Sequence, residues 1–341
     1  MSQNTARTTN VKTAVLGSGS WGTALAILLA KKGCSVNLWG IPEEIEAIAR
    51  DRENVRYLPG VRLPDAVRPT GSIEEALAGR EAVVLAIPST GVREVARLLK
   101  NRLSPRTLLV NAGKGLESTT GLRGSQVIRE ELGDEIGDGC VALSGPNLAV
   151  ELARDVPTAT VVACIDPDRA AAAQELFWAP SLRVYRNYDV IGVELGGALK
   201  NVLAIGAGVS DGLGYGDNTK ATLVTRGLME MIRLGSALGA DPRTFTGLSG
   251  FGDLMATCAS RLSRNLRLGT MLGQGKTLQE SLRELGQVAE GMHTCRAAYL
   301  LSRKLDVYMP ITHEIHAVLF EGKPPQRAVH DLMSRDHKEE F

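Results

Sequence analysis

Aromatic side chains are scarce in this chain, and its charges nearly cancel. Phenylalanine, tryptophan and tyrosine make up 4% of the 341 residues, and the formal net charge is +1 at pH 7. Base-stacking platforms need aromatic rings, and surfaces that attract nucleic acid or anionic membranes need an excess of basic groups. The composition therefore predicts that nucleic acid is not a partner.

Paired cysteines and a secretory leader are also lacking. No Cys-x-x-Cys pair occurs, and the first ten residues are polar, without the apolar stretch of a signal peptide. We expect a disordered tail over 1–10 and a cytoplasmic protein with reduced thiols. The five cysteines are Cys34, Cys140, Cys164, Cys258 and Cys295.

One apolar run, covering 190–209, is long enough to suggest a membrane span. However, Glu194, Lys200 and Asn201 lie within it, together with several glycines. A lipid-facing helix rarely carries such groups, whereas a buried helix can use them for function. We therefore expect a core helix here and no insertion into a membrane.

Motifs for a metal or a covalent nucleophile are missing as well. All five histidines lie at or beyond His293. His313 and His316 share a helix face, but no cysteine or carboxylate cluster completes a metal site. No Gly-x-Ser-x-Gly motif occurs, and Cys258 has no obvious histidine base. We expect neither a bound metal nor a nucleophilic serine or cysteine.

A glycine-rich turn near the amino terminus is the first motif that is present. An apolar strand over 11–16 leads into Gly17, Gly19 and Gly22, a helix follows, and a second strand occupies 35–39. These glycines allow a tight turn, a close backbone approach to a pyrophosphate and close packing of helix on strand. The helix N-terminus adds unpaired N–H groups and partial positive charge. The pattern predicts dinucleotide binding; the alternative is a glycine-rich turn without a ligand.

Strand-like and helix-like segments alternate through residues 11–189. This alternation predicts a dinucleotide-binding domain with a Rossmann-like, doubly wound α/β fold and a mainly parallel sheet. From 190 to 341 the segments are helical, which predicts an all-helical second domain for substrate binding and catalysis. Further strands are expected at 82–87, 107–111, 141–143, 160–164 and 183–185.

Two polar positions inside the apolar run suit proton transfer. Burial lowers the pKa of a lysine ammonium, so Lys200 can exchange a proton near neutral pH, and Asn201 can position a carbonyl or hydroxyl oxygen. The alternative for Lys200 is a side chain that extends to the surface. Asp253 follows two glycines, and it either orients the lysine or the substrate, or caps a helix.

Two further segments offer groups for an anion. Arg264 stands at a helix start, where a guanidinium and backbone N–H groups together suit a phosphate. Ser263, just before it, is equally suited to capping that helix. Lys114 lies between glycines at the carboxyl end of a strand, where such sheets bind ligands; a solvent-exposed loop lysine is the alternative.

The chain carries a series of short motifs in a defined order. They are Gly17-Ser-Gly-Ser-Trp-Gly-Thr-Ala24, Arg56-Tyr-Leu-Pro-Gly60, Ala112-Gly-Lys-Gly-Leu-Glu117, Leu143-Ser-Gly-Pro-Asn-Leu-Ala149, Glu194-Leu-Gly-Gly-Ala-Leu-Lys-Asn-Val-Leu-Ala-Ile205, Gly252-Asp-Leu254, Thr257-Cys258, Ser263-Arg-Asn265 and Val288-Ala-Glu-Gly-Met292. Together, from Lys12 to about His330, they resemble the bacterial-type NAD(P)-dependent sn-glycerol-3-phosphate dehydrogenases.

This resemblance implies roles for the matching residues. Lys200 is implied as the catalytic acid and base. The implied substrate contacts are Lys114, Gly145, Asn147, Lys200, Asn201, Asp253, Ser263, Arg264 and Asn265. The expected cofactor contacts are the three glycines Gly17, Gly19 and Gly22 with Ser20, Trp21, Lys114, Ala149, Arg264, Val288 and Glu290.

One position departs from the family pattern. Family members often carry a basic residue just after the second strand, but Ile41 stands there, followed by Glu43 and Glu44. A carboxylate near this point favours NAD through the ribose hydroxyls, and an arginine favours NADP. Arg50 is a candidate for reaching back to a phosphate. The expected cofactor is therefore NAD or NADP, with the preference open.

The expected function is reversible hydride transfer between NAD(P)H and dihydroxyacetone phosphate, giving sn-glycerol 3-phosphate. The resemblance also implies a homodimer that supplies glycerol phosphate for phospholipid synthesis. The alternatives are a related 6-phosphogluconate or β-hydroxyacid-type dehydrogenase and a non-catalytic dinucleotide sensor. The joint presence of Lys200, Asp253 and Arg264 argues against the sensor.

Overall fold

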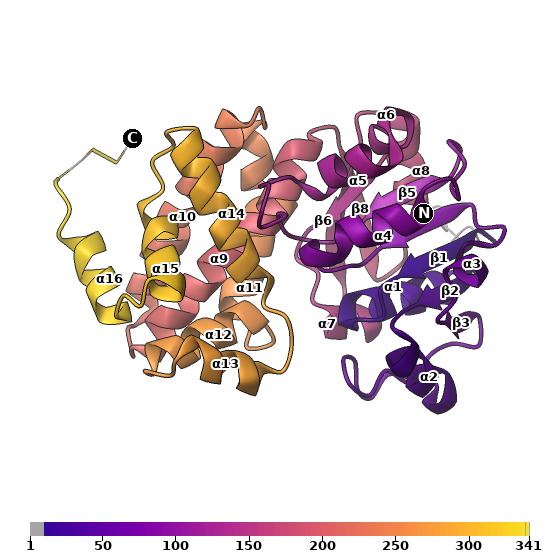
Figure 1. Cartoon of the computed structure of the whole chain (residues 1–341), viewed down its shortest axis with the longest axis horizontal. Coiled ribbons are helices and arrows are strands. Elements are labelled where there is room, and N and C mark those ends of the chain that lie inside the picture. Colours follow the sequence, from indigo (N-terminus) through magenta and orange to yellow (C-terminus); the bar gives the residue numbers. More distant parts are fainter. Residues whose placement is uncertain (1–9, 338, 341) are drawn as a thin grey trace, which may run out of the picture. The chain divides into compact units, whose positions relative to one another are not determined.

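An eight-stranded sheet forms the core of the amino-terminal part of the computed structural model (Figure 1). Its strand order is β3-β2-β1-β4-β5-β6-β7-β8, and β7 is antiparallel to β6, whereas all other neighbours are parallel. The mainly parallel sheet expected from the sequence is thus confirmed. The strands are β1 (Lys12–Leu16), β2 (Ser35–Trp39), β3 (Val67–Thr70), β4 (Ala82–Leu85), β5 (Leu108–Asn111), β6 (Val141–Ser144), β7 (Thr158–Ala163) and β8 (Leu182–Asn187).

Helices pack along this sheet in two groups, α4 with α5, and α1 with α7 and α8. The chain leaves β1 toward β2 on one side and continues from β4 to β5 and β6 on the other, so right-handed connections place these groups on opposite faces. This arrangement confirms the Rossmann-like, doubly wound fold. The helices are α1 (Ser20–Lys31), α2 (Pro42–Asp51), α3 (Ile73–Leu77), α4 (Val92–Leu99), α5 (Gly124–Leu132), α6 (Asp134–Gly137), α7 (Ala149–Ala153) and α8 (Pro167–Phe177).

The structure describes residues 10–337, 339 and 340, and its contacts divide the chain into two compact units. The first unit runs to Lys114 and resumes over Arg123–Glu194. The second comprises Gly115–Leu122 and the chain from Leu195 onward. The tail expected over 1–10 lies outside the described residues, except for Asn10.

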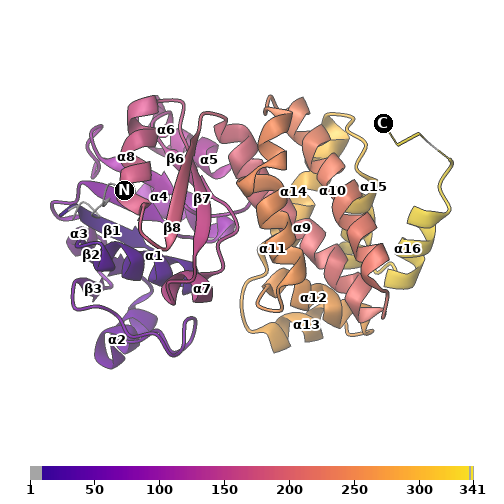
Figure 2. The same cartoon turned by 180° about the vertical axis from the view of Figure 1, so that it is seen from behind.

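The described part of the second unit is built from helices, which confirms the expected all-helical architecture (Figure 2). Short 3₁₀ and π turns at Pro242–Thr246 and Leu248–Gly252 precede α11. The helices are α9 (Val190–Gly212, which begins in the first unit), α10 (Asp217–Ala237), α11 (Asp253–Ala259), α12 (Arg264–Gly273), α13 (Leu278–Leu285), α14 (Glu290–Lys304), α15 (Pro310–Phe320) and α16 (Pro325–Met333).

Among the described residues, α9 alone is long and apolar enough to cross a membrane, judged by length and composition. However, 89% of its apolar 18-residue window is buried inside the protein. α9 is therefore a core helix, as its polar residues indicate.

Glycines bring α9 and α12 into backbone contact. Gly208 and Gly212 on α9 face Gly269 and Gly273 on α12, with four-residue spacing on both helices. A Cβ added to Gly269 would lie 2.0 Å from the carbonyl oxygen of Ile205, and one on Gly208 would lie 2.0 Å from that of Leu266. Because both obstacles are backbone atoms, only glycine permits this approach. We call these four residues the glycine clasp.

All five cysteines are free and buried. Burial raises the pKa of the thiols of Cys140, Cys164 and Cys295, and raises that of Cys258 to about 12. These four thiols are therefore protonated at neutral pH.

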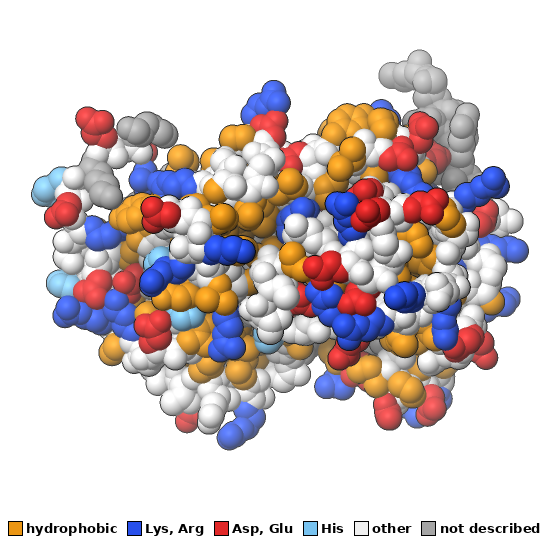
Figure 3. Space-filling model, turned by 45° about the horizontal axis from the view of Figure 1, so that its top comes forward, with side chains coloured by type: hydrophobic (Ala, Val, Ile, Leu, Met, Phe, Trp, Pro, Cys, Tyr) orange, Lys and Arg blue, Asp and Glu red, His pale blue; other side chains and the backbone are white. Residues whose placement is uncertain are grey.

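Charges of both signs are interspersed on the face shown in Figure 3. Many charged side chains of the described residues form ion pairs. Arg93, for example, lies 2.8 Å from Glu130 and 2.7 Å from Glu131 across α4 and α5. Ion pairs at the protein surface each contribute about 0–1 kcal/mol, so the folded state depends far more on the buried sheet and α9.

A buried carboxylate fixes the start of α15. Glu230 on α10 is 1% exposed and accepts hydrogen bonds from the N–H of Ile311 (2.6 Å), the N–H of Thr312 (3.0 Å) and the Thr312 hydroxyl (2.8 Å). These donors stabilise the carboxylate, but removal from water outweighs them and raises the pKa of Glu230 to about 6.

The raised pKa of Glu230 predicts a pH-dependent stability. The folded state holds the proton of Glu230 more tightly than the unfolded state, so the contribution of Glu230 to stability falls as pH rises from about 4.5 to about 6 and is constant above. The expected loss is about 2 kcal/mol. Urea unfolding of the protein and of Glu230→Gln across this range tests it. The destabilisation caused by Glu230→Gln should shrink by that amount as pH rises, and a pH-independent difference would contradict the prediction.

Candidate functional site

The glycine turn lies at the carboxyl ends of β1, β2 and β4. The N–H of Gly17 donates to the carbonyl of Trp39 at 2.9 Å. Gly17 has φ +117°, and a Cβ on Gly22 would lie 1.9 Å from the carbonyl oxygen of Gly17. Gly19 differs, since among the described residues, its own chain neighbours aside, no heavy atom lies within 4 Å of the position of its absent Cβ. The turn is therefore tightly packed toward the protein and open at Gly19.

The residues after this turn fit a dinucleotide. α1 begins at Ser20, and its N-cap, Gly19, supplies no side-chain hydrogen bond to the first N–H groups. The buried Nε1 of Trp21 has no hydrogen-bond partner among the residues that the structure describes. An open backbone, uncapped helix donors and an orphaned indole N–H together form a cradle for an anionic ligand with a polar group nearby.

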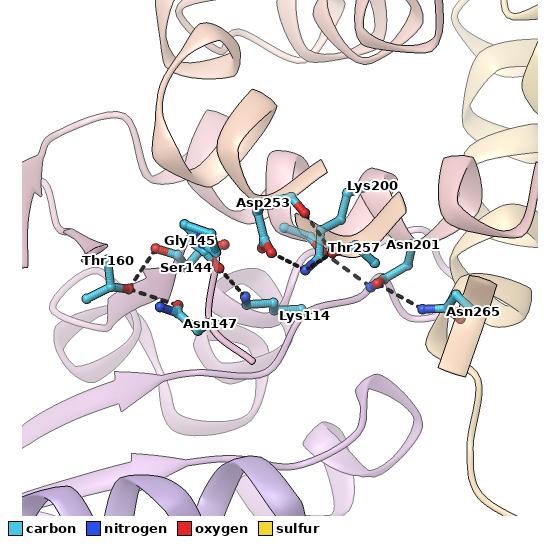
Figure 4. Close-up of polar contacts among 12 residues, drawn as sticks. Lys114, Ser144, Gly145, Asn147, Thr160, Lys200, Asn201, Asp253, Thr257 and Asn265 are labelled. Carbon is cyan, nitrogen blue, oxygen red and sulfur yellow. Dashed lines mark hydrogen bonds and ion pairs between the residues drawn. The ribbon is translucent and has the colours of Figure 1, made fainter. Parts of the chain in front are cut away.

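A second polar group lies at the ends of β5 and β6 (Figure 4). Lys114 donates from Nζ to the carbonyl of Gly145 at 2.8 Å, and Nζ lies 6.0 Å from the Trp21 ring. The Thr160 hydroxyl lies 2.9 Å from the carbonyl of Ser144 and 3.0 Å from Oδ1 of Asn147. The predicted residues Lys114, Gly145 and Asn147 thus lie together in the first unit, and Ala149 begins α7 just after them.

Lys200 is the centre of a buried cluster in the second unit (Figure 4). It is 7% exposed, and its ammonium forms an ion pair with Asp253, which is 1% exposed. Nζ also donates to the hydroxyl of Thr257 at 2.9 Å, and that hydroxyl lies 2.6 Å from the backbone carbonyl of Asp253. The side chain of Lys200 is therefore held inside the unit, and does not extend to the surface.

A chain of amides adjoins the lysine. Nδ2 of Asn265 donates to Oδ1 of Asn201 at 2.9 Å, and Oδ1 of Asn265 accepts from the N–H of Gly291 at 3.0 Å. The start of α14 lies close to α9 at this point, since a Cβ added to Gly291 would lie only 2.4 Å from the carbonyl oxygen of Asn201. These contacts fix the orientation of both asparagine side chains.

The remaining predicted residues stand at helix starts. Ser263 caps α12 by accepting from the N–H of Leu266 at 3.2 Å, and Arg264 is the first residue of that helix. Glu290 is the first residue of α14, and Val288, two residues before it, is 42% exposed. Ser263 therefore has the capping contact that the sequence left as one of two alternatives.

Arg50, the other predicted cofactor contact, pairs with its neighbour in the chain. It lies in the last turn of α2, at the other end from Ile41, and its guanidinium donates to Asp51 at 2.8 Å. Thr257 contacts the lysine, a role that the sequence motifs did not assign to it. Its position four residues after Asp253 places both on one helix face, and this spacing was the available signal.

Cys258 adjoins this cluster in sequence but offers no nucleophile. Its thiol is 2% exposed and its pKa is about 12, because burial disfavours the thiolate more than the nearby Lys200 favours it.

Comparisons with known proteins agree over nearly the whole chain. A family described as "NAD-dependent glycerol-3-phosphate dehydrogenase N-terminus" matches residues 12–170, and its "C-terminus" counterpart matches 189–330. Glycerol-3-phosphate dehydrogenase [NAD(P)+] of Pelotomaculum thermopropionicum is 53% identical, covering 97% of this chain and 95% of the relative. That of Geobacter metallireducens is 50% identical, covering 96% of this chain and 98% of the relative.

A solved structure agrees as well. The crystal structure of glycerol-3-phosphate dehydrogenase from Coxiella burnetii superimposes with a TM-score of 0.91 at 37% identity, covering 96% of this chain and 99% of the other. The predicted resemblance is therefore confirmed in sequence and in fold.

Proposed function

This chain belongs to the NAD-dependent glycerol-3-phosphate dehydrogenase family, and we propose that it interconverts dihydroxyacetone phosphate and sn-glycerol 3-phosphate with NAD(P)H. It is an oxidoreductase whose cofactor is NAD or NADP. The observation that carries the proposal is the buried Lys200–Asp253 ion pair with Thr257 at 2.9 Å from the ammonium. Reduction of a ketone by hydride transfer needs a proton donor of this kind at the carbonyl oxygen.

The lysine exchanges the proton in this proposal. During reduction, the ammonium of Lys200 donates to the developing alkoxide at C2, and in the reverse direction the neutral amine removes the hydroxyl proton. The carboxylate of Asp253 holds the ammonium in place, and the Thr257 hydroxyl fixes its direction. A bound nicotinamide supplies or accepts the hydride.

Other predicted residues hold the two ligands in this proposal. Gly17, Gly19 and Gly22 with Ser20 and Trp21 hold the dinucleotide. The remaining cofactor contacts we propose are Lys114, Ala149, Arg264, Val288 and Glu290. For the substrate, the proposed contacts are Lys114, Gly145, Asn147, Asn201, Ser263, Arg264 and Asn265.

The phosphate supplies orientation in this scheme. Arg264 offers a bidentate guanidinium at the first turn of α12, whose N–H groups and partial positive charge favour an anion. Asn265 follows it and is fixed by Asn201 and Gly291. Substrates without a phosphate should therefore react poorly, because they lose this binding energy.

An absorbance assay of dihydroxyacetone phosphate with NADH and with NADPH tests the function. We expect oxidation of the reduced cofactor, and in the reverse direction oxidation of glycerol 3-phosphate without release of carbon dioxide. Turnover of 6-phosphogluconate in place of glycerol 3-phosphate would contradict the substrate. Dinucleotide binding without turnover would support a sensor instead.

The family resemblance also supports three finer proposals. They are a homodimer, a cytoplasmic location and a role in supplying glycerol phosphate for phospholipid synthesis. Light scattering of the purified protein tests the first, since a monomeric mass would contradict it.

A further inference from the structure

The segment after β2 lies beside the glycine turn within the first unit. Leu16 and Trp39 are opposite one another in the β1–β2 register, and Gly17 donates to Trp39 at 2.9 Å. A Cβ on Gly40 would lie 2.1 Å from Oγ of Ser18, so the backbone at Gly40 packs against the glycine turn. In doubly wound folds this segment meets the adenosine ribose. A carboxylate there suits the 2′-hydroxyl of NAD, and an arginine suits the 2′-phosphate of NADP.

An apolar side chain and two carboxylates occupy this segment. Ile41 is 59% exposed and is the N-cap of α2, to which it gives no side-chain hydrogen bond. Pro42 at the helix start has no N–H, and Glu43 and Glu44 stand in the first turn. A helix N-terminus normally attracts anions. Here, however, the N–H of residue 42 is absent, and the carboxylates of Glu43 and Glu44 repel a bound phosphate. A 2′-phosphate carries about −1.5 to −2 charge at neutral pH.

Three arginines that follow this segment in the chain, Arg50, Arg52 and Arg56, already have partners. Nη1 of Arg56 lies 2.7 Å from Oε1 of Glu44, and the Tyr57 hydroxyl donates to the same oxygen at 2.8 Å. Arg52 donates to the carbonyls of Val67 (2.9 Å) and Pro64 (2.6 Å). Arg50 is bound to its neighbour Asp51. Glu44 thus both adds negative charge and holds Arg56.

From this arrangement we propose that the chain prefers NAD(H) to NADP(H), and that Ile41 and Glu44 set the preference. Ile41 has no positive charge to pair with a 2′-phosphate. Glu44 is a positioning residue, because it holds the guanidinium of Arg56. The reaction used to measure the preference is that of the proposed function, on which this part of the inference rests. A loss of one charge-assisted hydrogen bond corresponds to about tenfold in affinity or more, so we expect NADH to be favoured at least tenfold.

Calorimetric titration of the full chain with NADH and with NADPH, without substrate, tests the preference directly. We expect NADH to bind at least tenfold more tightly. Ile41→Arg should strengthen NADPH binding about tenfold, and rising salt should reduce this gain. Ile41→Gln has similar length without charge and should give no such gain. Glu44→Gln should narrow the NADH-to-NADPH ratio, because it releases Arg56.

A matched control introduces the same charge elsewhere in the unit. Ile165 is 71% exposed and follows β7, whose direction is antiparallel to β6 and which therefore ends at the opposite edge of the sheet. Ile165→Arg should change neither affinity, and an equal gain in NADPH affinity there would show only a general charge effect.

The outcomes separate this inference from the proposed function. Equal or tighter binding of NADPH by the unchanged protein would overturn the preference, as would a gain from Ile41→Gln equal to that from Ile41→Arg. If NADH binds preferentially but dihydroxyacetone phosphate is not reduced, the preference stands and the proposed function fails. Values of kcat/KM with both cofactors provide the second readout. If Ile41→Arg does not fold, Glu44→Gln still decides the role of the segment.

Discussion

Replacing Lys200 with alanine is expected to lower the turnover of dihydroxyacetone phosphate by about 10²- to 10⁴-fold. The ammonium is the proton donor in the proposed reaction, and Asp253 and Thr257 hold it in a buried position. The glycine turn belongs to the other compact unit, so the affinity for NADH should stay nearly unchanged. Stopped-flow or steady-state kinetics measure the first quantity, and titration of cofactor fluorescence measures the second.

Loss of the lysine charge has a second effect that needs a control. In Lys200→Ala the carboxylate of Asp253, which is 1% exposed, lacks its cation, and such a loss costs about 3–5 kcal/mol. The double variant Lys200→Met, Asp253→Asn removes both charges, so it should be more stable than Lys200→Ala and equally inactive. Added methylamine should restore part of the activity of Lys200→Ala. Near-normal turnover in either variant would exclude Lys200 as the acid and base.

Substitution of valine for Gly269 is expected to destabilise the second unit by at least about 3 kcal/mol. Its Cβ would lie 2.0 Å from the carbonyl oxygen of Ile205, 2.8 Å from the carbonyl carbon of the same residue and 2.9 Å from the backbone nitrogen of Val209. No side chain can move aside to relieve these contacts, so α12 must separate from α9. The variant should yield less soluble protein and a lower Tm.

The same variant should impair the site. Arg264 and Asn265 are the first residues of α12, and Asn265 bonds to Asn201 on α9 at 2.9 Å. Separation of the helices would stretch this bond and raise the KM for dihydroxyacetone phosphate. Gly216→Ala is the matched control, because no heavy atom of the described residues beyond its chain neighbours lies within 4 Å of its Cβ position, and its φ of −83° suits any residue. An unchanged Tm for Gly269→Val would show that the glycine clasp is not rigid.

Patterns confined to neighbouring residues predicted most of the fold. The glycine turn and the short apolar runs predicted β1, β2, β4 and β5, because the central strands of a parallel sheet are covered on both faces and are therefore apolar. β3 (Val67–Thr70) was missed because it reads Val-Arg-Pro-Thr. It lies at one end of the strand order, and there proline is tolerated and one side of the strand needs no partner.

Contacts between distant residues were harder to predict. The sequence suggested that Asp253 orients Lys200, and the two side chains do form an ion pair. Glu194, in contrast, appeared only as a polar interruption of α9. It accepts from Arg123 at 2.6 Å and from the N–H of Ser125 at 2.8 Å. Those partners lie about seventy residues earlier, at the start of α5, and no local spacing encodes such a contact.

The burial of all five cysteines gives each unit its own reporter of opening. An accessible thiolate attacks an alkylating reagent, so a buried thiol reacts only when the structure around it opens. Cys34, Cys140 and Cys164 report on the first unit, and Cys258 and Cys295 report on the second. The order in which these thiols are labelled therefore shows which unit opens first, in the native protein and without any introduced cysteine.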